Sequence, residues 1–506
     1  MADGTSGMRL TRRSLLATVW ATGLVACSPG PKSAATAPAG APAFDPGPDA
    51  TGLAELIAKG SMSPAEAVEA AIKRAQAAQP QINFMVTDTF DAARARAATT
   101  LTGPFAGVPT LIKDLNDVIG APTRYGSRAT EGAPPATEES LYVSTLLGSG
   151  LICIGKSATP ENGYLPTTEP LAFGPTRNPW DPTRSTGGSS GGTASAVAAG
   201  VVPMAHGNDG GGSLRFPSAN CGVFGLKPSR GRMVNEEAKP GPLEVGVQGC
   251  IARTVRDVAG ALAVTERTGD TAIFPPIGLV NAPVSRKLKV GVLTKGFAGF
   301  EADQSVADAV HGAAKLMESL GHTVSETNWP TAPSFSDDFL AYWSLGAAQD
   351  IANFAKQTGK KIDTTMVEPF SLQMAENAQK MKPEDIEAVQ KRLLAAGAAY
   401  DEWIKGFDIV LSPVFASPPS PLGYLRGDVP FDELRDRLIH QAGYTLIHNI
   451  SGAPAMSVPL GWSPEGLPIG VQACAANGAE RLLLETALQL EAAQPWAGKR
   501  PPIWVG

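Results

Sequence analysis

Histidine and cysteine are scarce in this chain, with five of each among 506 residues. The histidines lack the HExxH and HxxxH spacings of catalytic metal sites, and the cysteines form no CxxC pair. We therefore expect no metal, no disulfide framework and no organic cofactor. Four cysteines lie in apolar or small-residue surroundings and are predicted to be buried thiols. They are Cys153, Cys221, Cys250 and Cys474.

The chain also lacks an excess of positive charge. It has 42 Lys and Arg against 48 Asp and Glu, a net charge of -6. Because binding of nucleic acid requires a basic face, we exclude nucleic acid as the main partner. Hydrophobic residues make up 43% of the chain and charged residues 18%, which is typical of a globular protein with a large core.

The first 26 residues read as an export signal. Arg12 and Arg13 precede the apolar run 15–26, which is too short to span a bilayer. Small residues then lead to Cys27, as in the cleavage box of bacterial lipoproteins. We predict a twin-arginine, lipoprotein-type signal peptide over 1–26 and a lipid anchor on Cys27, with an ordinary cleaved signal as the alternative. Such a protein would be exported, to the periplasm or to the outer face of a bacterial membrane.

Residues 27–49 form a linker rich in Pro, Ala and Gly that has nothing to bury. A single folded domain is predicted over 50–506. Strand and helix patterns alternate there: 104–118 reads as a short strand with a turn, and 141–156 as a helix followed by a buried strand. This alternation predicts an α/β layer fold. No internal repeat or shift of composition marks a second domain.

The most informative stretch is 187–218. It places Ser189 and Ser213 in glycine-rich turns on either side of a helix of small residues. Glycine lets backbone N–H groups approach a ligand closely, as an oxyanion hole requires. The stretch therefore indicates a hydrolase with a serine nucleophile. The N–H groups predicted to hold the oxyanion are those of Gly210, Gly211, Gly212 and Ser213.

Lys113 is the candidate base. It lies in the apolar segment LIKDL, so its ammonium group is predicted to be poorly hydrated, and poor hydration lowers the pKa of a lysine. A neutral lysine can accept a proton. The alternative is an ordinary surface lysine paired with Asp114 or Asp117.

Together these residues resemble the amidase signature family of hydrolases. The hallmark of that family is a GGSSGG turn followed at a fixed distance by a (D)xGGS turn, present here at 187–192 and 209–213. The resemblance continues through 221–232 and covers nearly everything from about 50 to 500. It implies an amidase domain built on one large mixed β-sheet sandwiched between α-helices, an α/β/α arrangement.

The resemblance also implies a Ser-Ser-Lys triad. Ser213 would be the nucleophile, Ser189 the bridging serine held by a cis peptide bond, and Lys113 the general base. Lys113 would take a proton through Ser189 as Ser213 attacks the acyl carbon, and would return it to the leaving nitrogen. Water would then cleave the acyl-enzyme.

Residues beside the two turns have supporting roles. Asp209 and Arg215 flank the nucleophile and are predicted to pair and hold its turn. Ser190 either donates a second hydrogen bond to the triad or is a plain turn serine. The family commonly has Thr or Ile where this chain has Gly210, which predicts a looser oxyanion turn. His206 is most simply a packed residue or one that supports the site.

Within the family, the segments 167–181, 202–213 and 488–501 look most like the branch of 6-aminohexanoate cyclic dimer hydrolases and broad amidases such as aryl acylamidases. This implies hydrolysis of bulky, mostly apolar amides, including anilides and nylon-type oligomers, and extends to carbamates (urethanes), which present the same trigonal carbonyl. Selectivity is expected from 124–140, a Gly- and Pro-rich loop suited to a lid, and from the helical segment 335–440.

Other functions remain open at this point. GxSxG at 187–191 is also the nucleophile elbow of α/β-hydrolase esterases, which would make Ser189 the nucleophile and require His440 or His448. A ligand-binding lipoprotein without catalysis could use the glycine turns as an anion nest. The amide-hydrolysing subunit of a transamidation complex is disfavoured by the export signal. The expected partner is a small-molecule amide or carbamate, and a homodimer is left open.

Overall fold

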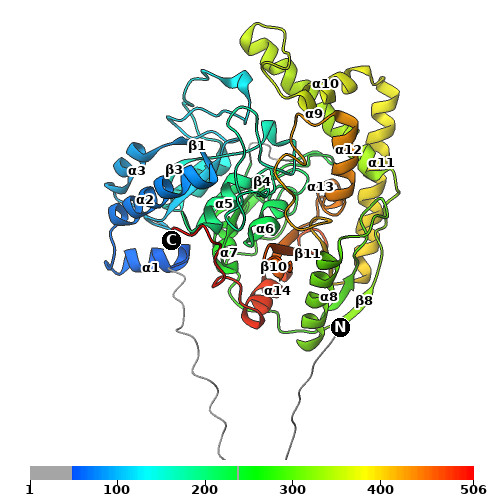
Figure 1. Cartoon of the computed structure of the whole chain (residues 1–506). Helices are drawn as coiled ribbons and strands as arrows, with labels where there is room; N and C mark the ends of the chain where they lie inside the picture. The colour runs from blue at the N-terminus through cyan, green and yellow to red at the C-terminus, as the bar shows by residue number, and fades with distance from the viewer. Residues whose placement is uncertain (1–47, 236–238) are drawn as a thin grey trace, which may run out of the picture. The chain divides into compact units, whose positions relative to one another are not determined.

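The computed structural model describes residues 48–235 and 239–506 (Figure 1). The predicted signal peptide over 1–26 and the predicted anchor at Cys27 lie outside these residues. Helix α1 (Ala50–Ala58) is the first element, and Asp49 caps it by accepting a hydrogen bond from the N–H of Gly52. In the part of the chain that is described, no helix combines the length and apolarity needed to cross a membrane.

A mixed eight-stranded sheet forms the centre of the fold, with the order β4-β6-β5-β10-β11-β9-β7-β8. Neighbouring strands are antiparallel from β4 to β9, whereas β9, β7 and β8 run parallel. The strands are β4 (Met204–Asp209), β5 (Phe224–Lys227), β6 (Val247–Ala252), β7 (Lys289–Val292), β8 (Thr323–Glu326), β9 (Ile409–Pro413), β10 (Ala455–Trp462) and β11 (Pro468–Cys474).

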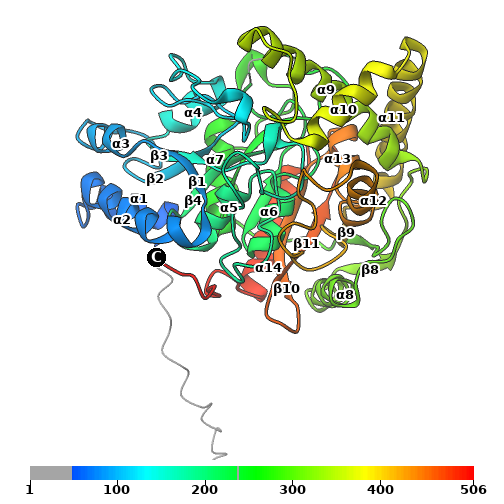
Figure 2. The ribbon, with the colours of Figure 1, turned by 45° about the horizontal axis from the view of Figure 1, so that its top comes forward.

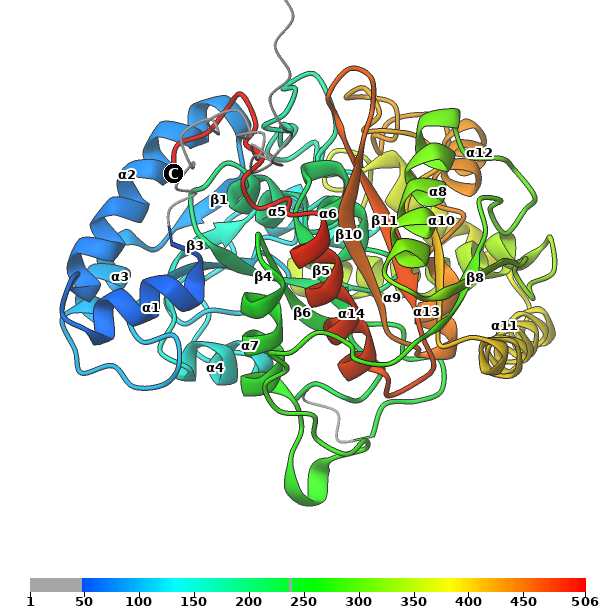
Figure 3. The ribbon, with the colours of Figure 1, turned by 90° about the horizontal axis from the view of Figure 1, so that it is seen from below.

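Helices cover both faces of this sheet. On one face, α5 (Gly191–Ala198) packs against β4 and β6, and α6 (Arg215–Cys221) packs against β5, β10 and β11 (Figure 2). On the other face lie α7 (Val255–Thr265), α8 (Gln304–Ser319) and α14 (Glu480–Ala493) (Figure 3). The predicted α/β/α layers are confirmed. Every residue of α5 is buried, since its small side chains let the helix lie close to the sheet.

A separate three-stranded sheet carries Lys113. In it β1 (Met85–Asp88) and β2 (Pro109–Lys113) flank β3 (Ile152–Ser157). The sequence reading foresaw only the large sheet and did not foresee this smaller one. Strand β2 meets β4 through side chains rather than through a backbone ladder: the hydroxyl of Thr110 donates to the carbonyl of Met204 at 2.9 Å. This contact lies near the start of both strands and sets β2 beside β4.

The segment 335–440, predicted to be mostly helical, contains four helices that lie to one side of the large sheet (Figure 1). Ser63 and Glu66 form a capping box at the start of α2. The remaining helices are α2 (Pro64–Ile82), α3 (Phe90–Ala97), α4 (Leu141–Gly148), α9 (Phe335–Thr358), α10 (Pro369–Lys380), α11 (Pro383–Trp403), α12 (Phe431–Gln441) and α13 (Leu446–Ser451).

One local prediction needs correction. The cysteines at 221, 250 and 474 are buried free thiols as predicted, whereas Cys153 is only partly buried. Its thiol lies on β3 and donates to the carbonyl of Gly155.

Candidate active site

Lys113 is fully buried at the end of β2, and its Nζ reaches two oxygens. It lies 2.6 Å from Ser189 Oγ and 2.6 Å from Asn208 Oδ1. Burial lowers the pKa of Lys113 well below its ordinary value, and the charge of nearby Asp209 opposes this only in part. The structure therefore holds an amine that favours its neutral form against a serine hydroxyl.

The expected alternative, a surface lysine paired with a neighbouring aspartate, does not occur. Asp114 forms a buried ion pair with Lys156, at 3.0 Å, and Asp117 accepts a hydrogen bond from the hydroxyl of Thr123. Burial raises the pKa of Asp114 to about 6, while the Lys156 charge acts in the opposite direction. Both carboxylates are therefore occupied away from Lys113.

Ser189 lies in the tight turn that leads into α5. The peptide bond between Gly188 and Ser189 is cis, as the resemblance implies. A Cβ at residue 188 would lie 2.5 Å from the carbonyl oxygen of Thr167, so only glycine fits there. A Cβ at Gly163 would lie 3.1 Å from Ser189 Oγ. The buried hydroxyl of Ser189 is thus enclosed between Lys113 and the chain at Gly163.

Of the two roles left open by the sequence, the structure favours that of a turn serine for Ser190. Its hydroxyl donates to the backbone carbonyl of Asn208, at 3.2 Å, and not to Lys113 or to the other serines. It therefore joins the turn of Ser189 to strand β4.

His206 supports Lys113 from β4. Its Nδ1 accepts the backbone N–H of Lys113 at 3.2 Å, and its Nε2 lies 2.9 Å from Gln248 Oε1. Since Nδ1 accepts, the ring proton is on Nε2. Burial lowers the pKa of His206 to about 3. A neutral ring therefore fixes the end of β2, which agrees with the supporting role expected from the sequence.

Asp209 and Arg215 form a fully buried ion pair behind the turn of Ser213. Arg215 Nη2 lies 2.9 Å from Asp209 Oδ1, and Nε lies 3.0 Å from Oδ2. The same carboxylate accepts the backbone N–H groups of Gly212 and Leu214. Burial alone would raise the pKa of Asp209, but the Arg215 charge holds it well below its ordinary value. One ionised carboxylate thus shapes the whole turn.

The other donors of Arg215 reach the C-terminal part of the chain. Nη1 donates to Gln472 Oε1 on β11, and Nη2 donates to Asn449 Oδ1 on α13. The amide of Asn449 in turn donates to Asp209, at 2.9 Å. Segments more than 200 residues apart in sequence therefore meet at this ion pair.

The oxyanion turn offers three of the four predicted donors. The N–H of Gly212 donates to Asp209 at 2.8 Å, so it is not available to an oxyanion while that bond is made. The N–H groups of Gly210, Gly211 and Ser213 have no hydrogen-bond partner among the described residues. These three remain the candidates for the oxyanion hole.

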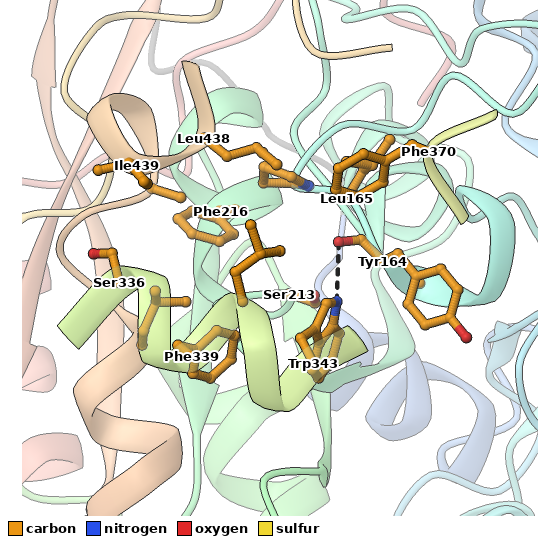
Figure 4. Close-up of a pocket in the computed structure, with 16 residues that line it drawn as sticks. Tyr164, Leu165, Ser213, Phe216, Ser336, Phe339, Trp343, Phe370, Leu438 and Ile439 are labelled. Atoms are coloured by element: carbon orange, nitrogen blue, oxygen red, sulfur yellow. Dashed lines mark hydrogen bonds between the residues drawn. The ribbon is translucent and has the colours of Figure 1, made fainter. Parts of the chain in front are cut away.

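Ser213 opens on an apolar pocket of about 620 Å³, part of it open to solvent (Figure 4). Gly163 lines the same pocket, and Ser189 lies next to Gly163 without lining the pocket itself. None of the lining residues is charged. They are Gly163, Tyr164, Leu165, Pro166, Gly211, Ser213, Phe216, Ser336, Phe339, Leu340, Trp343, Phe370, Leu438, Ile439, Ala442 and Leu446.

The two polar aromatic residues of the wall direct their polar atoms elsewhere. The phenol of Tyr164 points away from the pocket and donates to Asp350 (Figure 4). The Nε1 of Trp343 donates to the carbonyl of Tyr164 at 3.3 Å. The lining side chains therefore offer only two hydroxyls, those of Ser213 and Ser336, to a bound molecule.

The two segments expected to set selectivity differ in position. Helices α9 and α12 of the 335–440 segment form one side of the pocket. The loop 124–140 lines none of it and borders a separate, open hollow. Two contacts hold that loop in place, since Ser127 donates to Glu161 and Arg128 donates to the carbonyl of Thr364. The 124–140 loop is therefore not a wall of this pocket.

The esterase alternative requires a histidine hydrogen-bonded to Ser189, and the geometry supplies none. His448 is buried beside Arg215, and His440 lies near the end of α12. Among the described residues, Ser189 Oγ is instead bonded to Lys113. Within 48–235 and 239–506, no three His, Cys, Asp or Glu side chains are grouped so that they could hold a metal ion.

Sequence reasoning missed Asn208 as a neighbour of Lys113. Side chains of a strand alternate between its two faces, so His206 and Asn208 of β4 point to the same side, and Asp209 points to the other. His206 and Asn208 both contact Lys113, whereas Asp209 contacts Arg215. A period-two reading of HGND would have found Asn208.

Known proteins resemble this chain along nearly its whole described length. The family described as Amidase matches residues 66–484. The 6-aminohexanoate-cyclic-dimer hydrolase of Pseudomonas sp. (strain NK87) is 38% identical over 484 residues, which cover 90% of this chain and 96% of that protein. The acylamidase of Rhodococcus erythropolis is 32% identical over 483 residues, with coverage of 89% and 96%. A solved structure of 6-aminohexanoate cyclic dimer hydrolase has a TM-score of 0.84 at 35% identity, and the match covers 90% of this chain and 99% of that one.

Proposed function

Because this chain belongs to the amidase signature family, an enzyme family that hydrolyses amide C–N bonds, we propose that it is a serine amidase acting on bulky, neutral amides through Ser213, Ser189 and Lys113. One observation carries the proposal. The buried amine of Lys113 lies 2.6 Å from Ser189 Oγ, beside the apolar pocket that Ser213 lines.

In the proposed chemistry a proton is relayed from Ser213 through Ser189 to Lys113 and then returned along the same route. As Ser213 Oγ attacks the carbonyl carbon, its proton passes to Ser189 Oγ, and the proton of Ser189 passes to Nζ of Lys113. The negative charge on the former carbonyl oxygen is held by free N–H groups of the 210–213 turn. The proton then returns by the same route to the leaving nitrogen as the C–N bond breaks. Water hydrolyses the acyl-enzyme with the same relay.

A lysine can serve as the base here because it is buried. An ammonium group has no lone pair, so Lys113 must be neutral before it can accept a proton. Burial favours that neutral form by removing water from the charged one. The relay therefore requires no histidine.

The pocket supports neutral substrates. No charged side chain lines it, so a substrate carboxylate or ammonium that entered it would lose its hydration without gaining a partner. The apolar lining, with the rings of Phe216, Phe339 and Phe370 in it, suits a bulky apolar acyl or amine group. The cyclic dimer of 6-aminohexanoate named for the Pseudomonas relative has no free terminus and is neutral. We propose that cyclic amides, anilides and carbamates share this site.

Hydrolysis assays and covalent labelling together test the proposal. Purified protein is given a neutral anilide, the cyclic 6-aminohexanoate dimer and an aryl carbamate, alone and with the substitutions Ser213→Ala, Ser189→Ala and Lys113→Ala. Each substitution should lower kcat/KM by about 10³-fold or more, since the triad acts as a unit. Ser195→Ala is the control and should keep most of the activity, because the buried hydroxyl of Ser195 on α5 donates to the backbone carbonyl of Arg177 and not to Lys113 or the two serines.

Labelling by a fluorophosphonate separates the remaining alternatives. Attachment at Ser213 that Lys113→Ala abolishes would support the triad. Attachment at Ser189 that depends on His440 or His448 would support the esterase. No attachment at any serine, together with no hydrolysis of any amide or carbamate, would favour a ligand-binding protein and reject the proposal.

We also propose that the protein is exported and that Cys27 carries a lipid, on the strength of the sequence around Arg12, Arg13 and Cys27. Fractionation of cells that express the full chain tests this. Replacing both arginines by lysine should retain the protein in the cytoplasm, and Cys27→Ala should release it from the membrane fraction. Identical distributions of all three proteins would reject export and anchoring.

A further inference from the structure

We propose that Asn208 is a positioning residue for Lys113: its side-chain oxygen takes one N–H of the amine and so directs the lone pair of the amine at Ser189. This inference rests on the proposed function, because it assigns a role within the triad. Asn208 itself touches neither the nucleophile nor the pocket.

The donor and acceptor count at Nζ supports this role. A neutral amine has two N–H groups and one lone pair, and an amide oxygen can only accept. The contact of 2.6 Å between Nζ and Asn208 Oδ1 must therefore use an N–H of Lys113. The contact of 2.6 Å to Ser189 Oγ can then use the lone pair, with the hydroxyl as donor. Nζ has no third hydrogen-bond partner in the described part of the chain.

The amide of Asn208 is itself held in place. Its Nδ2 donates to Asn116 Oδ1 at 3.4 Å, and the Nδ2 of Asn116 donates to Ser140 Oγ at 3.3 Å. The backbone carbonyl of Asn208 accepts the hydroxyl of Ser190, and its strand pairs with β6. The contact with Asn116 sets which end of the amide faces Lys113, and the backbone contacts hold the residue in place.

The neutrality of this acceptor matters as much as its position. Around Lys113, β4 contributes the neutral ring of His206 and the carboxylate of Asp209, which Arg215 neutralises. On the neighbouring strand β3, Lys156 is paired with Asp114. Helix α5 carries no titratable side chain, and α2 turns apolar residues inward. A carboxylate in place of the amide at 208 would hold Lys113 as ammonium and remove its lone pair.

This role of Asn208 does not change which protons move in the proposed relay. When the proton of Ser189 reaches Nζ, the ammonium keeps its bond to Asn208 Oδ1 and later donates the same proton back to Ser189 Oγ. Asn208 gains and loses no proton. It contributes by orientation, which is effective because the two contacts are made before the substrate arrives.

Two substitutions at this position test the inference through the pH dependence of kcat/KM on a neutral anilide. Asn208→Asp should move the acidic limb of the profile to higher pH by about one unit or more, because a carboxylate stabilises the ammonium. Asn208→Leu should move that limb to lower pH or leave it in place, and should lower kcat by about tenfold or more while KM changes little. A rise of the acidic limb with Asp but not with Leu, from two substitutions of similar size, would not arise from a merely structural role.

Asn178→Asp is the matched control. Asn178 is also fully buried and donates to two backbone carbonyls, but its contacts do not include Lys113. It should change the thermal transition without moving the acidic limb. The pH dependence of fluorophosphonate labelling gives a second readout that needs no substrate.

The inference is overturned if both Asn208 variants fold and keep the wild-type limb, or if neither folds, since Asn208 is then structural. Failure of the proposed function looks different. In that case the wild-type protein itself hydrolyses no amide, or Lys113→Ala keeps its activity.

Discussion

The indole ring of Trp343 lies against the backbone of Gly210: a Cβ at residue 210 would be 2.8 Å from Trp343 Cη2. Trp343 comes from α9, whereas Gly210 belongs to the turn before Ser213. The sequence reading expected a looser turn from the small residue at 210. The indole fills the space that a larger residue would occupy, so the turn is packed instead.

We expect Gly210→Thr to lower kcat/KM by about tenfold or more, because the new side chain displaces either the indole or the oxyanion donors. Adding Trp343→Ala to the same chain should restore part of the loss, since the space is then free. Assays on a neutral anilide measure both. Gly312→Ala on α8 is a control with nothing within 4 Å of its Cβ, and it should leave the rate unchanged. Equal loss in the single and double variants would contradict this reading.

Asp209→Asn should destabilise the protein by about 3 kcal/mol or more, because it leaves the charge of Arg215 buried without a counter-ion. Urea unfolding measures the change in free energy. Glu301→Gln breaks an ion pair with Lys295 in which both side chains are more than half exposed, and it should cost less than about 1 kcal/mol. Similar changes in the free energy of unfolding in the two variants would show that burial does not increase the contribution of the Asp209–Arg215 pair to stability.

Lys113→Met should abolish hydrolysis and alter how stability depends on pH. Burial lowers the pKa of Lys113 in the folded protein, whereas in the unfolded chain it returns to 10.5. Below pH 10.5 the unfolded chain therefore binds a proton that the folded protein does not. The free energy of unfolding falls as the pH falls from 10.5 towards the lowered pKa, by up to about 1.4 kcal/mol per pH unit. Because methionine binds no proton, Lys113→Met lacks this fall in unfolding free energy. Unfolding free energies measured from pH 10 to 7 should shift in favour of Lys113→Met, and parallel curves would contradict the prediction.

Leu438→Glu should weaken hydrolysis of neutral substrates and improve that of substrates with an ammonium group on the part that enters the pocket. Leu438 on α12 is one of the apolar lining residues, and a carboxylate there gives a cation its missing partner. The ratio of kcat/KM for a matched neutral and cationic pair should change by about tenfold. Leu394→Glu, at an exposed position of α11, is the control and should not change the ratio.

The parts of the site that lie close together in sequence were predictable. Glycine-rich turns singled out Ser189, which contacts Lys113, and Ser213, which lines the pocket. The apolar neighbours of Lys113 correctly indicated its burial. Charges at Asp209 and Arg215 predicted a pair that the structure contains. Each of these inferences needed only local chemistry, namely the space a turn allows or the hydration a charge loses.

What the sequence did not reveal depends on contacts between distant segments. The walls of the pocket come from residues 163–166, α6, α9 and α12, and no local pattern says that these meet. Gly212 was predicted as an oxyanion donor because it is small, yet its N–H donates to Asp209. The second sheet was also missed. The sequence shows that 109–113 is a strand, but it does not show that this strand packs against β4 through side chains instead of joining the large sheet.

The network around Arg215 has a consequence for biosynthesis. The lysine and both serines have left the ribosome long before Asn449 and Gln472 are made, but the turn of Ser213 is held by a guanidinium that these late residues engage. If the proposed roles of Lys113, Ser189 and Ser213 hold, we expect a nascent chain that stops near residue 440 to contain all three residues and to hydrolyse no amide. Hydrolytic activity would arise only when translation is nearly complete. An unfinished chain would then not hydrolyse amides in the cell that makes it.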